Sequence, residues 1–335
     1  MKLKLPMAIT LAVALTAGLW LWVHHRPQPV AQPVATRVKP GIAPLSQPVP
    51  ANAPKMATIT GKPAGVPSQV LSPATSDWAA AQQIVDTRAG YEERMMAVNS
   101  LSGHLTDADW AVLQPFLLKP DGLDKDQLGQ VIKNRLLDML CAQNPPPTGL
   151  GDVLAQMYRD HQQDDVIRDY AVQHLTAYYE QMATQGDSAG TRQDIQNVLW
   201  EAVNETSDSI GGTALLALKR LSQEYPGFDQ GKIAATALQM AGNSTVGELT
   251  HITAFQVCAQ LGTADALPVV LQTAQNGETI PVKMSAIGAL GLLGGPEQIP
   301  FLNSVLAGTE DRLKPAAQHA LEQITTRQTQ LASQK

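Results

Sequence analysis

The sequence predicts an all-α fold in which about six helix pairs stack into a solenoid. Three observations predict it: part of the chain repeats after 32 residues, the repeated parts carry apolar residues at helical spacing, and strand signals are almost absent. Repetition at a period of 20–50 residues is typical of arrays whose small units bury their apolar faces by stacking on one another.

The repeat is clearest in the last third of the chain, where residues 250–277 and 282–309 share one pattern. A third copy begins 31 residues later, at Leu313. The corresponding residues of the first two copies are Thr250/Val282, Ala254/Ala286, Val257/Ala289, Cys258/Leu290, Leu261/Leu293, Gly262/Gly294, Asp265/Glu297, Leu267/Ile299 and Pro268/Pro300. Such agreement predicts one structural unit per copy.

Each unit is expected to hold two helices joined by a short turn. Its second helix has apolar residues at i, i+4, i+7, i+8 and i+11, which form one helical face: Val282, Ala286, Ala289, Leu290 and Leu293. Gly262 and Gly294 follow the last leucine and are typical of helix ends.

Looser copies of the second helix begin at Ile132, Ile167 and Ile210. Residues 91–118, with apolar residues at helical spacing, are expected to form the first pair. Longer joins between the upstream units, such as residues 144–147, predict that the curvature is uneven.

Residues 282–302, VKMSAIGALGLLGGPEQIPFL, resemble a HEAT repeat of the short bacterial kind that also occurs in phycobilisome lyases. The resemblance covers the last three units best and extends more loosely over residues 163–225. It implies a right-handed α-solenoid whose concave surface, lined by the second helices, grips a protein partner. It does not imply one activity, because a fold hosts many functions.

Residues 1–25 are predicted to be an uncleaved N-terminal membrane anchor. Residues 5–23 are uncharged, and a helix of that length spans roughly 28 Å, close to a bilayer core. Trp20 and Trp22 at its far end suit the membrane interface. The alternative is a cleaved signal peptide and a secreted protein, but a cut after Ala17 would leave both tryptophans exposed.

Residues 26–74 are predicted to be a flexible Pro-rich linker ahead of a solenoid over residues 75–330. Eleven prolines lie in residues 27–73, which favours an extended spacer. A Pro-rich ligand for another protein is the alternative. The short N-terminal tail favours a single-pass protein of the bacterial inner membrane, with its solenoid in the periplasm.

Motifs for chemistry are missing from the sequence, so we expect no catalytic residue, no cofactor and no metal site. The seven histidines are scattered, and neither Cys-x-x-Cys nor Gly-x-Ser-x-Gly occurs. Asp121, Asp124 and Asp126 favour a solvated turn over a calcium site. Cys141 and Cys258 are about three units apart, too far for a disulfide. A formal charge of −6 argues against a nucleic-acid partner.

One column of residues is the candidate functional site. The residue after the first apolar position of each second helix is a cation or histidine, with Gly211 as the exception: Lys133, Arg168, His251, Lys283 and Lys314. A cation in a first helical turn opposes the helix macrodipole, so something else must favour it. We favour a ladder in which each cation pairs with an acidic group or carbonyl of the neighbouring unit. The alternative is a basic ridge on the concave face for an acidic partner.

These features predict a membrane-tethered scaffold or adaptor of the bacterial cell envelope, which binds another protein in the solenoid groove. The alternative is a non-catalytic subunit or a lyase-like enzyme related to the phycobilin lyase repeats. We prefer the scaffold, because the chain has an export-type anchor and lacks a candidate acid–base pair.

Overall fold

A computed structural model describes residues 77–120, 128–185 and 189–334 of the chain. These residues form fourteen α-helices and three short 3₁₀ turns, with no strand among them. The predicted anchor and linker, and the aspartates of residues 121–126, lie outside the described residues. Within the described part, no helix is long and apolar enough to cross a membrane.

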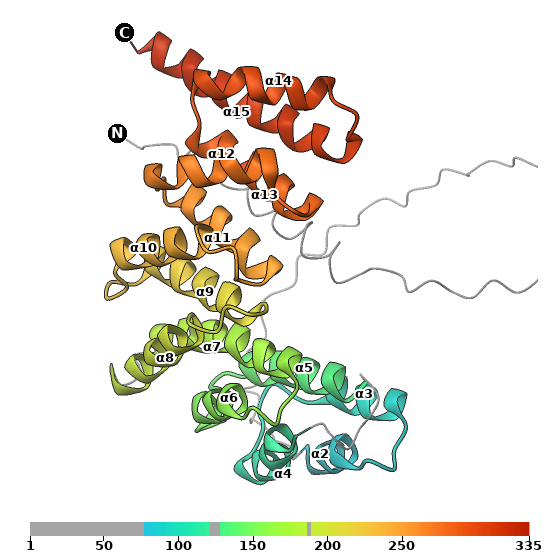
Figure 1. The fold of residues 1–335 in the computed structure, drawn as a ribbon. Helices are drawn as coiled ribbons and strands as arrows, with labels where there is room; N and C mark the ends of the chain where they lie inside the picture. The colour runs from blue at the N-terminus through green and yellow to red at the C-terminus, as the bar shows by residue number, and fades with distance from the viewer. Residues whose placement is uncertain (1–76, 121–127, 186–188, 335) are drawn as a thin grey trace, which may run out of the picture. The chain divides into compact units, whose positions relative to one another are not determined.

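The described helices alternate between two layers (Figure 1). The first helices of the pairs are α2 (Trp78–Val85), α4 (Asp107–Leu118), α6 (Leu150–Arg159), α8 (Ala189–Ala202), α10 (Gln230–Ala241), α12 (Leu267–Asn276) and α14 (Ile299–Ala307). The second helices are α3 (Tyr91–Ser100), α5 (Leu128–Cys141), α7 (Asp165–Gln185), α9 (Ile210–Glu224), α11 (Glu248–Gln260), α13 (Ile280–Leu293) and α15 (Lys314–Ser333). The described residues therefore hold seven pairs, one more than the sequence predicted.

The second helices form the more continuous layer. Each packs against the next in chain order, from α3 through α5, α7, α9, α11 and α13 to α15. In the other layer α2 packs against α4, α4 against α6, and α6 against α8. This stacking of each unit on its neighbours is the arrangement that the sequence repeat predicted.

Residues 91–118 do not form the first pair, and that prediction was wrong. They span α3 and α4, which belong to different pairs, because α3 packs against α2. Helix α2 has only eight residues, of which Ala81 and Ile84 are buried. That pattern is too short to show a helical period, so the preceding helix cannot be recognised from the sequence.

Side-chain caps fix where several helices begin. Thr106 accepts a hydrogen bond from the backbone N–H of Asp109 at 3.2 Å, and the Asp109 carboxylate accepts from the Thr106 N–H at 2.9 Å. Asp229 caps α10 by accepting from the N–H of Lys232 at 3.1 Å. Gly262 follows α11 with a φ of 66°, the left-handed conformation that favours glycine after a helix.

Small residues let the second helices of the C-terminal units approach closely. A Cβ atom on Gly291 of α13 would lie 2.9 Å from the Cα of Ala320 of α15. Ala286 and Leu290, on the same helix, are fully buried. Cys258 is also fully buried in the position that Leu290 occupies one unit later, as the repeat predicted. The core therefore runs along the contact between neighbouring units.

Candidate functional site

Arg168, in the first turn of α7, is almost completely buried, with 3 % of its surface exposed. Its Nε donates to the carbonyl oxygen of Tyr158 at 2.7 Å. Its Nη2 donates to both carboxylate oxygens of Glu205, at 2.8 and 2.7 Å, and its Nη1 donates to Asp165 at 3.2 Å. Burial alone would lower the pKa of Arg168, but these hydrogen bonds and charges raise it above its ordinary value. The guanidinium is therefore charged, and each of its three nitrogens donates a hydrogen bond to the fold.

Glu205 also binds the hydroxyl of Tyr158, which donates to its Oε1 at 2.7 Å. Burial, together with this hydrogen bond, raises the pKa of Tyr158. The Arg168 guanidinium lies 5.4 Å from the centre of the Tyr158 ring. Arg168, Tyr158 and the partly exposed Glu205 thus form one network that joins the α6–α7 pair to the turn before α9.

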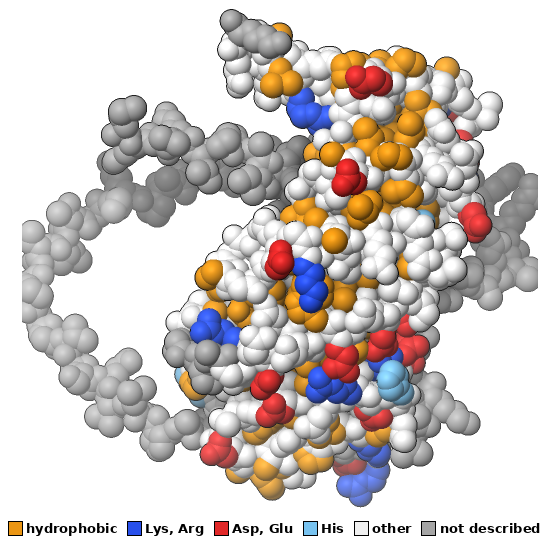
Figure 2. Space-filling model, turned by 60° about the vertical axis from the view of Figure 1, so that its left-hand side comes forward, with side chains coloured by type: hydrophobic (Ala, Val, Ile, Leu, Met, Phe, Trp, Pro, Cys, Tyr) orange, Lys and Arg blue, Asp and Glu red, His pale blue; other side chains and the backbone are white. Residues whose placement is uncertain are grey.

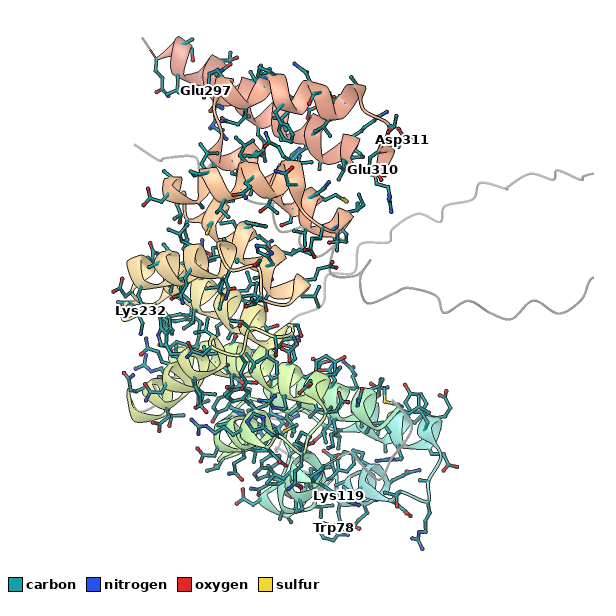
Figure 3. The ribbon with its side chains drawn as sticks, viewed as in Figure 1. Trp78, Lys119, Lys232, Glu297, Glu310 and Asp311 are labelled. Carbon is teal, nitrogen blue, oxygen red and sulfur yellow. The ribbon has the colours of Figure 1, made fainter. Side chains whose placement is uncertain are left out.

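Lys133 of α5 is also buried, with 1 % of its surface exposed. Its Nζ donates to the carbonyl of Lys119 at 2.6 Å and to Oε1 of Gln163 at 3.3 Å. Lys119 follows the last residue of α4 and is labelled in Figure 3. Gln163 in turn donates to the carbonyl of Leu118 at 3.0 Å. The two side chains together cap the C-terminal end of α4.

Two more residues make the same kind of contact. Nε of Arg94, in α3, donates to the carbonyl of Ile84 at 2.8 Å. Nε2 of His251, in α11, lies 2.8 Å from the carbonyl of Ala241, so this nitrogen carries the proton. The sequence analysis does not find Arg94, because it predicts that residues 91–118 form one pair. Arg94 could be recognised by its position, because it is the fourth residue of a second helix, as are Arg168 and His251.

The geometry of a helix pair explains these cations. In an antiparallel pair the first turn of the second helix lies beside the last turn of the first helix. The last turn has carbonyls without partners inside the helix, and it carries the negative end of the macrodipole. A donor on the second helix satisfies those carbonyls, which offsets its unfavourable place in its own helix. We call this contact the cation clamp: a column residue of a second helix donates to a C-terminal carbonyl of the first helix.

The clamp differs in one respect from the predicted ladder. The carbonyl belongs to the cation's own pair, whereas the ladder placed it in the neighbouring unit. The next unit contributes side chains instead, Glu205 for Arg168 and Gln163 for Lys133. A single cation therefore closes its own pair and also fastens that pair to the next one.

Gly211 is the exception in the column because the backbone leaves no room for a side chain. Its N–H donates to the carbonyl of Glu205 at 2.8 Å. A Cβ atom at this position would lie 2.4 Å from that carbonyl oxygen. The turn that supplies Glu205 to Arg168 thus occupies the place of a column side chain in α9.

Lys283 and Lys314 form no cation clamp. Lys314 pairs with Asp311 at 2.7 Å, and 36 % of the Lys314 side chain and 86 % of the Asp311 side chain are exposed. Lys283 is half-buried and makes no ion pair with any of the described residues. Arg312 lowers the pKa of Glu310 to about 2, and the charge of Lys283 contributes to that shift. Figure 3 labels Glu310 and Asp311 at the turn before α15.

The five predicted column residues are therefore not one exposed basic row. Lys133 and Arg168 are buried, and His251 is bound to a backbone carbonyl. On the face shown in Figure 2, Lys and Arg side chains are interspersed with acidic ones and form no continuous stripe.

A different feature distinguishes the second-helix layer from the other layer. Among the described residues, nine large hydrophobic side chains are exposed by 40–63 %, and all but Trp78 lie on second helices. We call the other eight the exposed apolar row: Met96, Leu128, Val131, Val166, Leu216, Leu249, Leu292 and Leu331. Every second helix contributes at least one of them. The sequence analysis missed this row, because single apolar residues on a helix do not show which face is exposed.

The titratable groups inside the fold have structural surroundings. Cys141 and Cys258 are free thiols, and burial raises the pKa of each to about 12, with the charge of Asp138 adding to the shift at Cys141. Burial lowers the pKa of His174, against the opposing effect of Asp138 at 3.8 Å. Within the described part of the chain, no group of three or more His, Cys, Asp or Glu side chains could hold a metal ion.

Comparison with known proteins agrees with this architecture. Residues 248–322, which include α11 to α14 and the start of α15, match a family model for HEAT repeats. This part of the chain consists of HEAT repeats. The described helices as a whole form a HEAT-like α-solenoid.

One solved structure among the matches is human deoxyhypusine hydroxylase in complex with glycerol. It is 16 % identical in sequence, the match covers 74 % of this chain and 95 % of that chain, and the TM-score is 0.33. No curated protein matches the chain at a significant level.

Proposed function

We propose that this protein is a membrane-tethered scaffold of the bacterial cell envelope, which holds a partner protein on its second-helix layer. In this proposal residues 1–25 anchor the chain in the inner membrane and residues 26–74 form a spacer. The solenoid then presents its surface in the periplasm. The observation that carries the proposal is the exposed apolar row.

Exposed apolar side chains that are scattered singly over a surface need no explanation. Here their distribution is uneven, since eight of the nine lie on one of the two layers. Fully burying one Val or Leu side chain contributes about 1.5–3 kcal/mol, so several such contacts can hold a partner. Large apolar patches that stay exposed on a protein surface mark sites of contact with other proteins.

The contacts of the column support a surface that binds through apolar contacts. Lys133 and Arg168 are held by carbonyls and side chains of the fold, so they stabilise the solenoid instead of facing a partner. Electrostatic attraction of an acidic segment by these residues is thereby disfavoured. The exposed apolar row is therefore the feature of this layer that a bound partner would bury.

The test of the scaffold is capture of its partner from native membranes after crosslinking. The double variant Val166→Ser, Leu249→Ser removes two exposed side chains from the row, which are 45 % and 42 % exposed, so the fold should hold. We expect the amount of crosslinked partner to fall at least tenfold. The matched control is Trp78→Ser, which removes an exposed apolar side chain from the other layer and should leave capture unchanged. Equal capture by the double variant and the wild type would contradict the proposal.

Topology has its own test. Alkaline phosphatase, which is active only in the periplasm, is fused after Lys335, and its activity is measured in intact cells together with sedimentation of the protein. We expect an active enzyme in the membrane fraction. Activity of a cytoplasmic reporter alone would contradict the orientation, and a mature N-terminus beyond Gly18 would contradict the anchor.

A further inference from the structure

The exposed aliphatic side chains of three neighbouring second helices point in one direction. Val166 of α7 and Leu249 of α11 each lie two residues before the column, and Leu216 of α9 lies five residues after it. A difference of seven residues is close to two full turns, so the directions agree to within about 20°. Since α7 packs against α9 and α9 against α11 (Figure 1), this shared direction places the three side chains on the same face of the second-helix layer.

Carboxylates border this surface at the turns that precede the same helices. Asp164, Asp208 and Glu248 lie before or at the start of α7, α9 and α11, where acidic groups also favour the helix. Asp164 accepts from the N–H of Val166 at 2.9 Å, and Asp208 accepts from the N–H of Ile210 at 2.8 Å. No Lys or Arg of the described residues forms an ion pair with these three carboxylates. Asp164 and Glu248 are exposed and Asp208 is partly exposed, so no cation of the described residues neutralises these charges by direct pairing.

The basic side chains of the same helix ends, which could neutralise these carboxylates, bind other groups of the fold. Arg168 is buried on Glu205 and Asp165, and His251 donates to the carbonyl of Ala241. Across residues 77–335 the sequence has 17 Lys and Arg against 30 Asp and Glu, a formal charge of −13. The electrostatic complement of this surface is a cation.

We propose that α7, α9 and α11 bind an amphipathic helix of a partner protein, aliphatic on one side and bearing Lys or Arg along the edge that faces the carboxylates. This inference rests on the proposed scaffold function and names the chemistry of its partner. The sign is opposite to the acidic partner that a basic ridge would have required.

The partner is a helix because the surface offers side chains and no free backbone edge. The described residues contain no strand to which an extended peptide could add its backbone hydrogen bonds. A helix satisfies its own backbone and binds through side chains alone. Three packed helices with axes 8–10 Å apart span about 20 Å. A partner helix of roughly 14 residues crosses that distance.

The test uses two synthetic 18-residue helical peptides with identical leucine positions, one with lysine and one with glutamate at the charged positions. The full-length protein is held in nanodiscs of phosphatidylcholine, and the photocrosslinker p-benzoylphenylalanine replaces Leu249. The matched control places it at Leu331, another exposed leucine of the row but one on α15. We expect the lysine peptide to label position 249 at least tenfold more than position 331, and tenfold more than the glutamate peptide labels position 249.

A second set of variants tests the three carboxylates that border the surface, those of Asp164, Asp208 and Glu248. The triple variant Asp164→Asn, Asp208→Asn, Glu248→Gln removes charge but keeps an acceptor oxygen at each position. We expect it to lower labelling by the lysine peptide at least fivefold at low salt, and less at high salt. The control variant Glu297→Gln, Glu322→Gln removes two charges from the C-terminal pair α14–α15 and its preceding turn and should change little. Circular dichroism melting confirms that each variant is folded.

Several outcomes would overturn the inference. They are equal labelling at positions 249 and 331, equal or stronger labelling by the glutamate peptide, and an unchanged result with the triple variant. Crosslinked dimers of the chain formed from position 249 without peptide would assign the surface to a second copy. Loss of partner capture by Val166→Ser, Leu249→Ser without any peptide charge preference would leave the scaffold standing and remove only this inference.

Discussion

The two ends of the solenoid hold their second helices in place by different means. In the N-terminal pairs, Arg94, Lys133 and Arg168 are buried and form cation clamps. In the C-terminal pairs, the equivalent Lys283 and Lys314 are partly exposed and bind no carbonyl of the preceding helix. The same column of the sequence thus forms clamps in α3, α5, α7 and α11, but none in α13 and α15.

The difference follows from the spacing of the units. The region that matches HEAT repeats, residues 248–322, has a period of 31–32 residues, which brings equivalent small residues of successive helices together. Gly291 of α13 lies close to Ala320 of α15, and Arg327 of α15 also donates hydrogen bonds to the carbonyls of Gly291 and Gly294. In the N-terminal pairs a buried cation of the second helix satisfies a carbonyl at the end of the first helix. In this region His251 still clamps its own pair, whereas the column residues of α13 and α15 bind no helix-end carbonyl, and Arg327 donates to the end of α13 instead.

Removing a cation clamp should cause the largest loss of stability among the variants that test the difference between the two ends. Arg168→Met leaves Glu205 without its charged partner and the carbonyl of Tyr158 without a donor, so we expect a loss of about 3–5 kcal/mol of stability. Chemical denaturation of the full chain and hydrogen exchange in α7 and α9 measure it. Adding Glu205→Gln should recover part of the loss. No recovery would mean that the network is not what holds these helices.

A bulkier residue at the close approach should break the C-terminal region instead. Gly291→Ala places a methyl group against Ala320, and we expect a loss of about 1–3 kcal/mol from overpacking. Gly288→Ala, on the same helix with nothing within 4 Å of the added Cβ, is the matched control. It should stabilise α13 by about 0.5–1 kcal/mol through helix propensity. Faster hydrogen exchange in both variants would contradict the role given to Gly291.

The lysines of the C-terminal pairs should matter little. Because Lys314 pairs with an exposed Asp311 and Lys283 with no described residue, Lys314→Met and Lys283→Met should each change stability by about 0–1 kcal/mol. Thermal melting followed by circular dichroism, beside Arg168→Met, provides the measurement. A loss as large as that of Arg168→Met would show that the two regions do not differ in this way.

The smallest expected effect is a pH dependence in the N-terminal region. Burial lowers the pKa of His174 below its ordinary value of 6.5, with Asp138 opposing the shift. The unfolded chain then binds a proton at a higher pH than the fold does, so this contribution is present above pH 6.5 and declines as the pH falls below it. His174→Gln should flatten the decline of stability between pH 7 and 5. An equally steep decline in the variant would assign it to other groups.

The fold was predictable where an apolar residue recurs at the same position of successive units. Ala286, Leu290 and Cys258 are buried as the repeat predicted, since apolar residues at helical spacing can be buried only on one face. Helix α2 could not be predicted, because its eight residues contain only two buried side chains, too few to show a helical period. The column was visible as a pattern, but Arg94 was missed with the first pair, and Gly211 could be explained only by the turn that packs against it.

The sequence by itself determined the two-helix unit, its stacking and the column of cations, because these depend on local periodicity and on repetition along the chain. Only the tertiary structure decided which cations are buried, which carbonyls they bind and which aliphatic side chains remain exposed. Those outcomes depend on how closely the end of one helix approaches the start of the next. That distance is set by the joins and by small residues on neighbouring helices, and no single position of the sequence carries it.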